Sequence, residues 1–456
     1  MHLTCDHLHQ PNGWLSPGTL TIDPLGRITA ITPGAIEGSS RVRGITLPGM
    51  SNLHSHAFQR ALGGFVQQAG PDKIDSFWTW REAMYRVALQ ITPDDLRTIS
   101  AQLYLEMLEA GYTAVGEFHY VHNQPDGRPY DSPTAMSTAV INGANAAGIA
   151  MTLLPVAYFS GGFGVDAEPQ QRRFVHENAD AYCRLWTDLA ALCAESKVPL
   201  GVAPHSLRAV PAPMLNDIIA TTRGDDPETR IHMHVAEQPQ EVEQAKEFLG
   251  ASPVRWLIDN QPVDANWCLI HATHIDADEM AQIAARQPVV GLCPSTEADL
   301  GDGLFPAAKF RSVDGRWGIG SDAHTMVSVS RELALLEWGQ RLQRQRRLVL
   351  ADPNTHIGRG LFDGAARDGA DALDHPIGEL RAGHRADFVV LNAEHPRLVG
   401  LEPNAAIDAW IFSGADDAVD EVWVAGQKRV ESGRHIHRDR IQAEFAATMR
   451  RLARAL

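Results

Sequence analysis

The 456-residue chain, with 44% hydrophobic and 21% charged residues, has the composition of an ordinary globular protein and is long enough for one large and one small domain. Its net charge of -16 argues against a nucleic-acid-binding protein, which normally carries a basic face. The charge does not exclude a small anionic substrate, because one local arginine is enough to bind it.

The sequence predicts a soluble, cytoplasmic protein. The first residues, MHLTCDHLHQPNGWL, lack the basic stretch and the apolar stretch of a signal peptide. No run of about 18 apolar residues predicts a membrane span. The five cysteines form no C-x-x-C pair, which favours reduced, mostly buried thiols.

Residues 1–47 are typical of a small β-module. Short β-prone stretches at 19–22 and 27–31 are separated by turns at 23–26 and 32–34. These turns contain proline and glycine, which punctuate strands.

From Gly49 onward, strands alternate with helices. Apolar runs that end in polar residues give eight strand candidates: MSNLHSH, TAVGEFHY, MTLLPVAYF, LGVAPHSLR, RIHMHVAEQ, WCLIHATHI, VVGLCPSTEADL and WGIGSDAHT. Apolar residues at helical spacing predict helices over 92–110, 179–195, 239–249, 276–286, 330–349 and 354–364. This alternation predicts a (β/α)8 barrel, whose active site lies at the carboxyl ends of its strands. An open doubly wound sheet is the alternative, but no G-x-G-x-x-G follows the first strand.

Short strands return at 385–391, 421–424 and 427–435, so we expect the two chain ends to pair into one small β-sandwich module. The final stretch is an arginine-rich helix whose charges are interpreted as a solvated face. The expected organisation has four segments: 1–47 and 376–437 in the β-module, 48–375 in the barrel, and 438–456 in the terminal helix.

The end of the first predicted strand carries His54-Ser55-His56. Residues i and i+2 of a strand lie on the same face, so the two imidazoles project together, as a shared metal ion requires. Alone, such a pair also fits a wet surface position in a chain with 20 histidines.

Further candidate ligands fall at the ends of the fifth, sixth and eighth strands, within residues 232–237, 271–274 and 320–324. Each has an ordinary alternative, since a strand histidine is often a core residue and Asp322 could cap a helix. Because barrel chemistry occurs where the carboxyl ends of the strands meet, their joint placement predicts a metal-assisted catalytic site.

His54-x-His56, the fifth-strand and sixth-strand histidines and the eighth-strand aspartate together resemble the amidohydrolase superfamily. IGELRAGHRADF at 377–388, and VWVAG at 422–426 followed by Gly433-Arg434, are similar to the tail of its deaminase members. The resemblance spans nearly the whole chain and implies a metal-dependent hydrolase.

The resemblance also implies a metal site. Binuclear members commonly bridge two ions with a carboxylated lysine at a middle strand end, but the only lysine between Tyr120 and His205 is Lys197, which precedes the fourth strand. Glu117 is interpreted as structural rather than as a second-metal ligand. The pattern favours one divalent ion bound by His54, His56, His234 of the H-x-x-E motif, and Asp322. Three imidazoles and one carboxylate suit zinc, and iron is an alternative.

The implied chemistry is hydrolytic deamination. A divalent ion makes hydroxide available near neutral pH. Asp322 would take the water proton and Glu237 would relay protons to the departing nitrogen. His271 would polarise the attacked group and stabilise the tetrahedral intermediate.

The substrate class depends on other side chains near the strand ends. Arg208, at the end of the predicted fourth strand, suits a bidentate grip on a carboxylate, although a surface ion pair is the alternative. Gln59 and Tyr120 add hydrogen-bonding groups. The segment 64–90 is expected as a long loop, a lid or an interface, and its Arg81 is a second carboxylate candidate.

Within the superfamily, LHSHAFQRAL, FWTWREAMY, GEFHY, APHSLR, HVAEQ, HATH and GIGSDAHT resemble the formimidoylglutamate deiminase family. That resemblance implies hydrolysis of N-formimidoyl-L-glutamate, a dicarboxylate of histidine degradation, to N-formyl-L-glutamate and ammonia. It implies four substrate contacts: Gln59, Tyr120, His205 and Arg208.

Two rival functions stay open at this point. Another deaminase of the branch, acting on a purine, an adenosine derivative or a triazine, would need a flat pocket rather than an arginine facing a carboxylate. A non-catalytic barrel scaffold is disfavoured by the intact ligand set with Glu237 and His271. No nucleic-acid or membrane partner is expected, and a homodimer is the default assembly.

Overall fold

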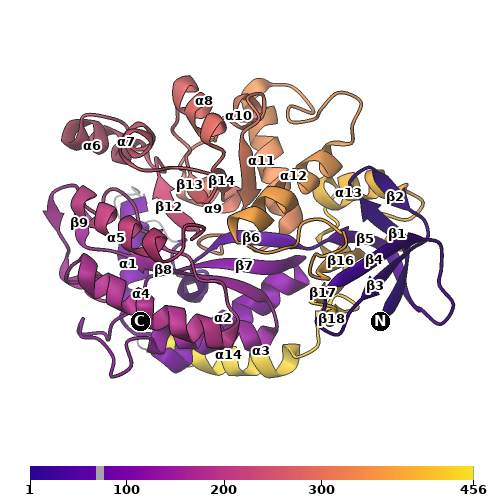
Figure 1. The fold of residues 1–456 in the computed structure, drawn as a ribbon, viewed down its shortest axis with the longest axis horizontal. Helices are drawn as coiled ribbons and strands as arrows, with labels where there is room; N and C mark the ends of the chain where they lie inside the picture. The colour runs from indigo at the N-terminus through magenta and orange to yellow at the C-terminus, as the bar shows by residue number, and fades with distance from the viewer. Residues whose placement is uncertain (68–76, 455–456) are drawn as a thin grey trace.

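The computed structural model describes residues 1–67 and 77–454, and in this part of the chain two four-stranded parallel sheets close into a barrel (Figure 1). One sheet has the order β11-β8-β7-β6 and the other β12-β13-β14-β15. Parallel bridges between Val202 and Ile231 and between Ser55 and Asp322 join the two sheets. The strands are β6 (Met50–Ser55), β7 (Tyr112–His119), β8 (Ala150–Ala157), β11 (Ala203–Pro204), β12 (Ile231–Val235), β13 (Trp267–His271), β14 (Val289–Leu292) and β15 (Arg316–Ile319). The predicted (β/α)8 barrel is confirmed.

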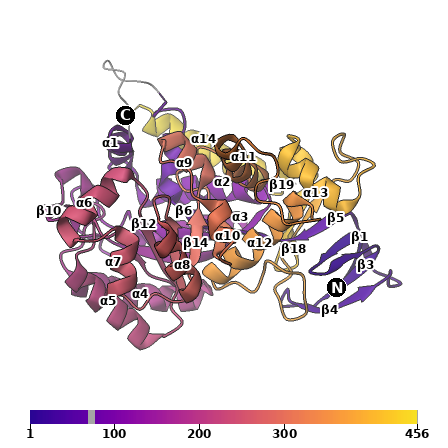
Figure 2. The ribbon, with the colours of Figure 1, turned by 90° about the horizontal axis from the view of Figure 1, so that it is seen from above.

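Helices follow the barrel strands and pack around them (Figures 1 and 2). They are α1 (Phe77–Ala88), α2 (Pro93–Glu109), α3 (Ala135–Ala147), α4 (Ala179–Ser196), α5 (Ala212–Asp225), α6 (Pro239–Leu249), α7 (Pro253–Asn260), α8 (Ala277–Arg286), α9 (Pro294–Leu300), α10 (Ala307–Arg311), α11 (Val329–Arg344) and α12 (Ile357–Ala372). Helices α2 and α8 begin where predicted because Thr92 with Asp95, and Asp276 with Glu279, form capping boxes.

Several predicted elements differ from the structure. The segment after β14, expected as part of a strand, is α9, with Pro294 in its first turn. The helix expected to reach Val349 ends at Arg344, because Gln345 adopts a left-handed conformation with φ 51°. The FWTWR segment, expected in a loop, begins α1; the part of the predicted 64–90 loop at 68–76 lies outside the described residues.

The C-terminal end of α12 closes the bottom of the barrel. The Nε2 atom of His232 lies 2.9 Å from the Ala372 carbonyl oxygen, and the Thr152 hydroxyl donates to the Leu373 carbonyl. Leu53 lies in the interior, where Gly291 and Gly318 give it room: a Cβ at either would come within 2.6 Å of a Leu53 methyl group. These contacts fill the end of the barrel at which the strands begin, so the polar site lies at the other end, where the strands finish.

Both chain ends share one nine-stranded sheet beside the barrel, so the predicted pairing of the termini is confirmed. The N-terminal strands are β1 (His2–Gln10), β2 (Gly13–Leu15), β3 (Gly18–Ile22), β4 (Ile28–Pro33) and β5 (Ser40–Pro48); the C-terminal ones are β16 (Phe388–Leu391), β17 (Val419–Val424), β18 (Gln427–Glu431) and β19 (Arg434–His435). Strand β5 pairs antiparallel with β16. Because β5 leads through Gly49 into β6, the module anchors the strand that carries the His-x-His pair.

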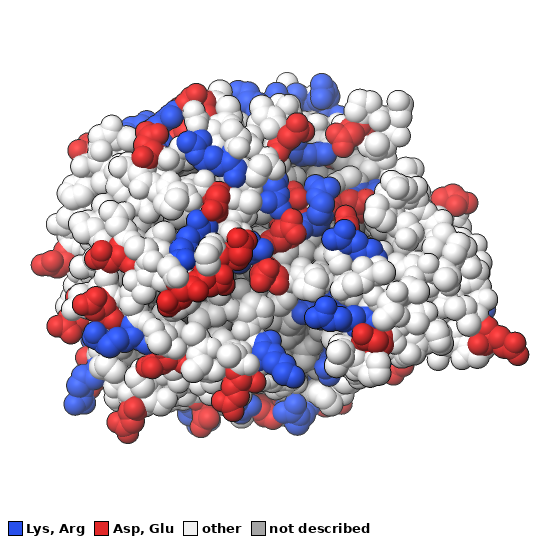
Figure 3. Space-filling model, viewed as in Figure 1, with Lys and Arg blue, Asp and Glu red and all other residues white. Residues whose placement is uncertain are grey.

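The C-terminal region adds two helices, α13 (Pro403–Phe412) and α14 (Arg438–Leu452). Helix α14 lies along α2, and its arginines are not all solvated, since Arg438 pairs with Glu109 at 2.9 Å. Charged side chains of both signs are interspersed on the face drawn in Figure 3. None of the helices within the described ranges has the length and apolar character of a transmembrane helix. The domain boundaries, the cytoplasmic location and the absence of nucleic-acid partners stay predictions.

Candidate metal and catalytic site

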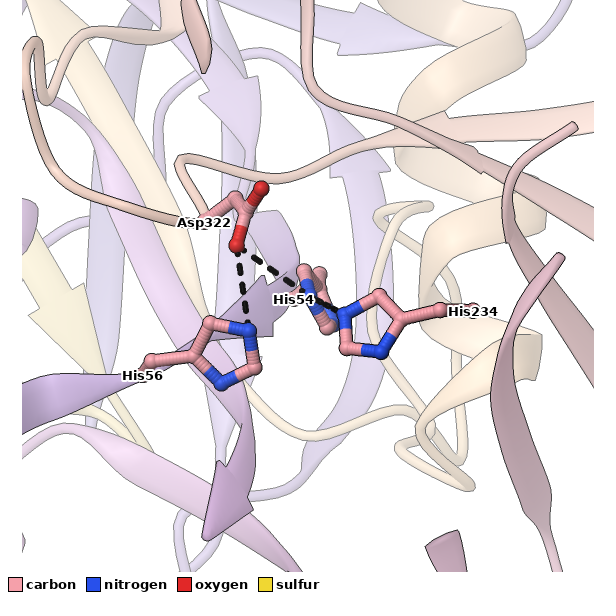
Figure 4. Close-up of side chains that lie close together, drawn as sticks. All are labelled: His54, His56, His234 and Asp322. Atoms are coloured by element: carbon pink, nitrogen blue, oxygen red, sulfur yellow. Dashed lines mark hydrogen bonds and ion pairs between the residues drawn. The ribbon is translucent and has the colours of Figure 1, made fainter. Parts of the chain in front are cut away.

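The four side chains predicted as metal ligands lie together at the carboxyl ends of β6, β12 and β15 (Figure 4). One nitrogen from each histidine and one oxygen of Asp322 all lie within 4.8 Å of one another. Oδ1 of Asp322 is 3.1 Å from Nε2 of His56 and 3.4 Å from Nε2 of His54. Nε2 of His54 is 3.0 Å from Nε2 of His234.

Backbone contacts between the first and last barrel strands bring these residues together. The Asp322 N–H donates to the His54 carbonyl at 3.0 Å. Gly320 allows this approach, since a Cβ there would lie 2.8–2.9 Å from backbone and Cβ atoms of His54. Asp322 has φ 44° and His271 has φ 68°, so non-glycine residues adopt left-handed backbone at two of the strand ends. Such strain persists only where the surroundings hold it, and it is common at functional sites.

Hydrogen bonds to the outer ring nitrogens orient two of the histidines. His56 Nδ1 donates to the Phe118 carbonyl at 2.9 Å, and His234 Nδ1 donates to the His205 carbonyl at 3.0 Å. Each bond leaves Nε2 with a lone pair directed at the shared point. Burial lowers the pKa of His54 to about 3 and that of His234 well below its usual value, so both rings are neutral. Neutral nitrogens and a carboxylate oxygen facing one another suit a divalent cation.

The buried Glu117 carboxylate supports the His-x-His turn from below. It accepts hydrogen bonds from Ser55 Oγ at 2.6 Å, from the Ala57 N–H at 2.7 Å and from the Tyr104 hydroxyl at 3.0 Å. Burial raises its pKa to about 7 despite these donors. Glu117 does not belong to the group of possible metal ligands that His54 forms with its neighbours. This agrees with its interpretation as a structural residue.

The predicted proton-transfer residues lie beside the ligand cluster. Nε2 of His271 is 3.7 Å from both a Glu237 oxygen and an Asp322 oxygen, and its Nδ1 is 3.3 Å from Glu297. Burial alone would lower the pKa of His271, but the three neighbouring carboxylates raise it to about 10. Burial raises the pKa of Glu237 against the positive charges of His271 and Arg208. A protonated imidazole therefore faces a carboxyl group that holds its proton more tightly than usual.

Sequence reasoning missed two acidic residues here, Glu297 and Asp302. Besides contacting His271, Glu297 accepts the Cys293 N–H at 2.8 Å. Asp302 is buried, accepts a hydrogen bond from the Gln238 amide, and has an oxygen within 4.8 Å of Glu237 and His271. Burial and the Glu237 charge raise the Asp302 pKa to about 9. The signal was the acidic run STEADLGD, most of which was expected within the seventh strand and to which no role was assigned.

The five predicted substrate contacts line one pocket that opens onto the ligand cluster: Gln59, Arg81, Tyr120, His205 and Arg208. Gln59 Nε2 donates to the Tyr120 hydroxyl at 2.7 Å. Arg208 is only 7% exposed and lies 3.6 Å from Glu237, so the alternative of a surface ion pair is wrong. Arg81 reaches the pocket from α1 rather than from a loop.

Known proteins resemble this chain over its whole length. The model of the amidohydrolase family matches residues 45–429. The formimidoylglutamate deiminase of Pseudomonas aeruginosa is 46% identical over 442 residues, which cover 96% of each chain. The crystal structure of an amidohydrolase from Brucella melitensis is 40% identical and has a TM-score of 0.93 over 99% of each chain. An adenosine deaminase from Xanthomonas campestris, crystallised with zinc, is 17% identical with a TM-score of 0.81, covering 99% of this chain and 98% of that one; at this identity it shares the fold alone.

Proposed function

The chain belongs to the amidohydrolase family, and from this premise we propose that it hydrolyses N-formimidoyl-L-glutamate to N-formyl-L-glutamate and ammonia. The observation that carries the proposal is a buried arginine, Arg208, in the pocket that opens onto His54, His56, His234 and Asp322. A buried guanidinium suits a carboxylate substrate. The similarity to the Pseudomonas deiminase supports the same reaction.

The four ligands fit a single divalent ion, and zinc suits their three nitrogens and one oxygen, with iron as the alternative. When bound, such an ion supplies a hydroxide nucleophile near neutral pH. The remaining chemistry belongs to the side chains around it.

Three residues move and hold the protons of the reaction. Asp322 accepts the proton of the attacking water, because its second oxygen faces His271 rather than a ligand histidine. His271 is held protonated and stabilises charge that develops on the attacked formimidoyl group. Glu237, with its raised pKa, delivers a proton to the departing nitrogen, so that ammonia leaves. Water thus replaces the terminal imine nitrogen, and the bond to the glutamate nitrogen stays intact.

The pocket favours a dicarboxylate over the rival substrates. Arg81 and Arg208 place two positive charges in it, and Gln59, Tyr120 and His205 add polar groups. A dicarboxylate brings negative charge to these guanidinium groups, which a neutral purine or triazine does not supply. The substrate also places the reaction in histidine degradation, and a homodimer remains the proposed assembly, which light scattering would measure.

Ammonia release tests this function. Zinc-loaded protein is offered formimidoylglutamate, guanine, adenosine and a triazine at equal concentrations, with bound metal measured in the same sample. Turnover of formimidoylglutamate alone is expected. Turnover of a purine without turnover of formimidoylglutamate contradicts the proposal, and a metal-loaded but inert protein supports the scaffold reading.

A further inference from the structure

A buried glutamine behind the substrate pocket fixes the direction of two tyrosine hydroxyl groups. Glu168-Pro169-Gln170-Gln171 forms a short capped turn in which the Gln171 Oε1 atom accepts the Glu168 N–H at 2.7 Å. A backbone N–H only donates, so this bond fixes which end of the amide is oxygen. The Gln171 Nε2 atom then donates to the Tyr85 hydroxyl at 2.9 Å and to the Tyr158 hydroxyl at 2.8 Å. Gln171 is 0% exposed, so water does not compete.

Counting donors shows where the hydroxyl hydrogens must go. The amide has two hydrogens, and both are used, so each tyrosine oxygen is an acceptor toward Gln171. At most one hydroxyl can donate to the other tyrosine, so at least one hydroxyl hydrogen must leave the cluster. Both tyrosines line the pocket, and no other acceptor for either hydroxyl is found among the described side chains of residues 1–67 and 80–454. The free donor therefore faces the pocket.

Positive charge surrounds this donor. The Arg81 guanidinium carbon lies 5.6 Å from the centre of the Tyr85 ring, and Arg208 lines the same pocket. Burial raises the pKa of both tyrosines, while the two guanidinium charges lower it to a smaller extent. The hydroxyl groups thus keep their hydrogens at neutral pH and lie within the field of both arginines.

From this arrangement we propose that Tyr85 and Tyr158, oriented by Gln171, bind one carboxylate of the substrate. The tyrosine pair donates a hydrogen bond to the carboxylate whose charge the arginines neutralise, and it thereby helps the site to distinguish a carboxylate from an amide. Tyr85 and Tyr158 are specificity residues, and Gln171 is a positioning residue. The inference rests on the proposed function.

Gln171→Glu tests the orientation, and Tyr85→Phe and Tyr158→Phe test which hydroxyl is the donor. A carboxylate at 171 accepts from both hydroxyls and turns their hydrogens away from the pocket, while its Oε1 position still accepts the Glu168 N–H. We expect Gln171→Glu and at least one tyrosine variant to raise KM for formimidoylglutamate about 10- to 100-fold, as for one hydrogen bond to a charged group, with kcat changed less than about threefold. Gln170→Glu adds the same charge on the same turn and should leave KM near that of the wild type.

Substrate analogues separate carboxylate binding from a structural effect. Wild type and variants are compared on formimidoylglutamate and on its two analogues in which one carboxylate, α or γ, is a carboxamide. The rise in KM of each variant over wild type should shrink to about threefold or less for the analogue that lacks the carboxylate bound by the tyrosines. An equal loss on all three substrates, or no loss in either tyrosine variant, overturns the inference even if Gln171→Glu is unstable, because Tyr85→Phe and Tyr158→Phe give the same readout. Failure of the wild type on formimidoylglutamate instead overturns the proposed function, and this inference with it.

Discussion

The surroundings of each carboxyl group in this site determine its pKa and therefore its role. Burial raises the pKa of the Glu237 carboxyl, against the positive charges of Arg208 and His271, whereas two histidine nitrogens hold the pKa of the Asp322 carboxylate well below its usual value despite burial. The two carboxyl groups in one pocket thus differ in how tightly they hold a proton, as acid–base catalysis requires.

Glu237→Gln isolates the proton-transfer role. The amide keeps the shape of the side chain but cannot carry a proton to the leaving nitrogen, so kcat should fall about 10²- to 10⁴-fold. Metal content, measured by elemental analysis, should stay at the wild-type level because Glu237 is not among the four ligands. Glu243→Gln, an exposed position on α6, the helix that follows Glu237, serves as the control and should keep full activity. Loss of metal from the Glu237 variant would show that the residue is a ligand instead.

Arg208→Met tests substrate binding at the same scale. Removing a guanidinium that binds a carboxylate should raise KM for formimidoylglutamate about 10- to 100-fold or more, since hydrogen bonds between charged groups contribute about 1.5–3 kcal/mol. Arg128→Met removes an exposed arginine paired with Asp126 and should leave the kinetics unchanged. An unchanged KM in the Arg208 variant would remove this residue from the substrate site.

At the scale of elements, close packing between strands and helices sets the geometry of the site. Strand β15 approaches β6 at Gly320, and α9 is tied to α11 where Ser295 donates from its backbone N–H and its hydroxyl to the Glu332 carboxylate. Gly320 lies against His54, and Ser295 lies two residues before Glu297, which contacts His271. Changes at either position therefore act on the site without touching the substrate.

Gly320→Ala should damage the metal site through the backbone. The added methyl group would lie within 3 Å of His54, so β6 and β15 must separate and the ligand distances must grow. We expect bound metal to fall well below one equivalent while the circular dichroism spectrum stays close to that of the wild type. Gly364→Ala, within α12, has only ordinary contacts at 3.6 Å and should bind metal normally. Full metal occupancy in the Gly320 variant would contradict this account of the strand contact.

Glu332 predicts a pH dependence of stability. Burial raises its pKa to about 8 in the folded chain, above its value near 4.5 in the unfolded chain, so the folded state binds this proton more tightly. Its contribution is present below about pH 4.5 and is lost as the pH rises to 8, at up to about 1.4 kcal/mol per pH unit. Relative to wild type, Glu332→Gln should gain thermal stability steadily from pH 5 to pH 8. A difference in melting temperature that stays constant from pH 5 to pH 8 would refute the raised pKa of Glu332. The exposed control variant Glu247→Gln should show such a constant difference from wild type.

Across the whole molecule, sequence alone predicted what depends on periodicity and strand order. Strand alternation and the shared end of barrel strands indicated the His-x-His pair and the candidates at 232–237 and 320–324, and the family resemblance then selected His54, His56, His234 and Asp322. Contacts between side chains that are distant in the sequence could not be predicted from those rules. Gln171 meets Tyr85 only because a turn after β8 packs against α1, a helix that was expected as a loop.

The starts of helices could likewise be predicted only where a local sequence signal marks them. Helix starts at Thr92 and Asp276 were predictable from their caps, whereas α9 was missed because its apolar approach reads as a continuing strand. The roles of Glu297 and Asp302 follow from that missed helix, which turns the acidic run back toward His271.

The most direct measurement follows both products of the reaction by NMR in zinc-loaded enzyme. The proposed function predicts one N-formyl-L-glutamate and one ammonia for each N-formimidoyl-L-glutamate consumed, because water replaces only the terminal imine nitrogen. Glutamate with formamide would mean that the other C–N bond breaks. Either that outcome, or turnover of a purine alone, would contradict the account.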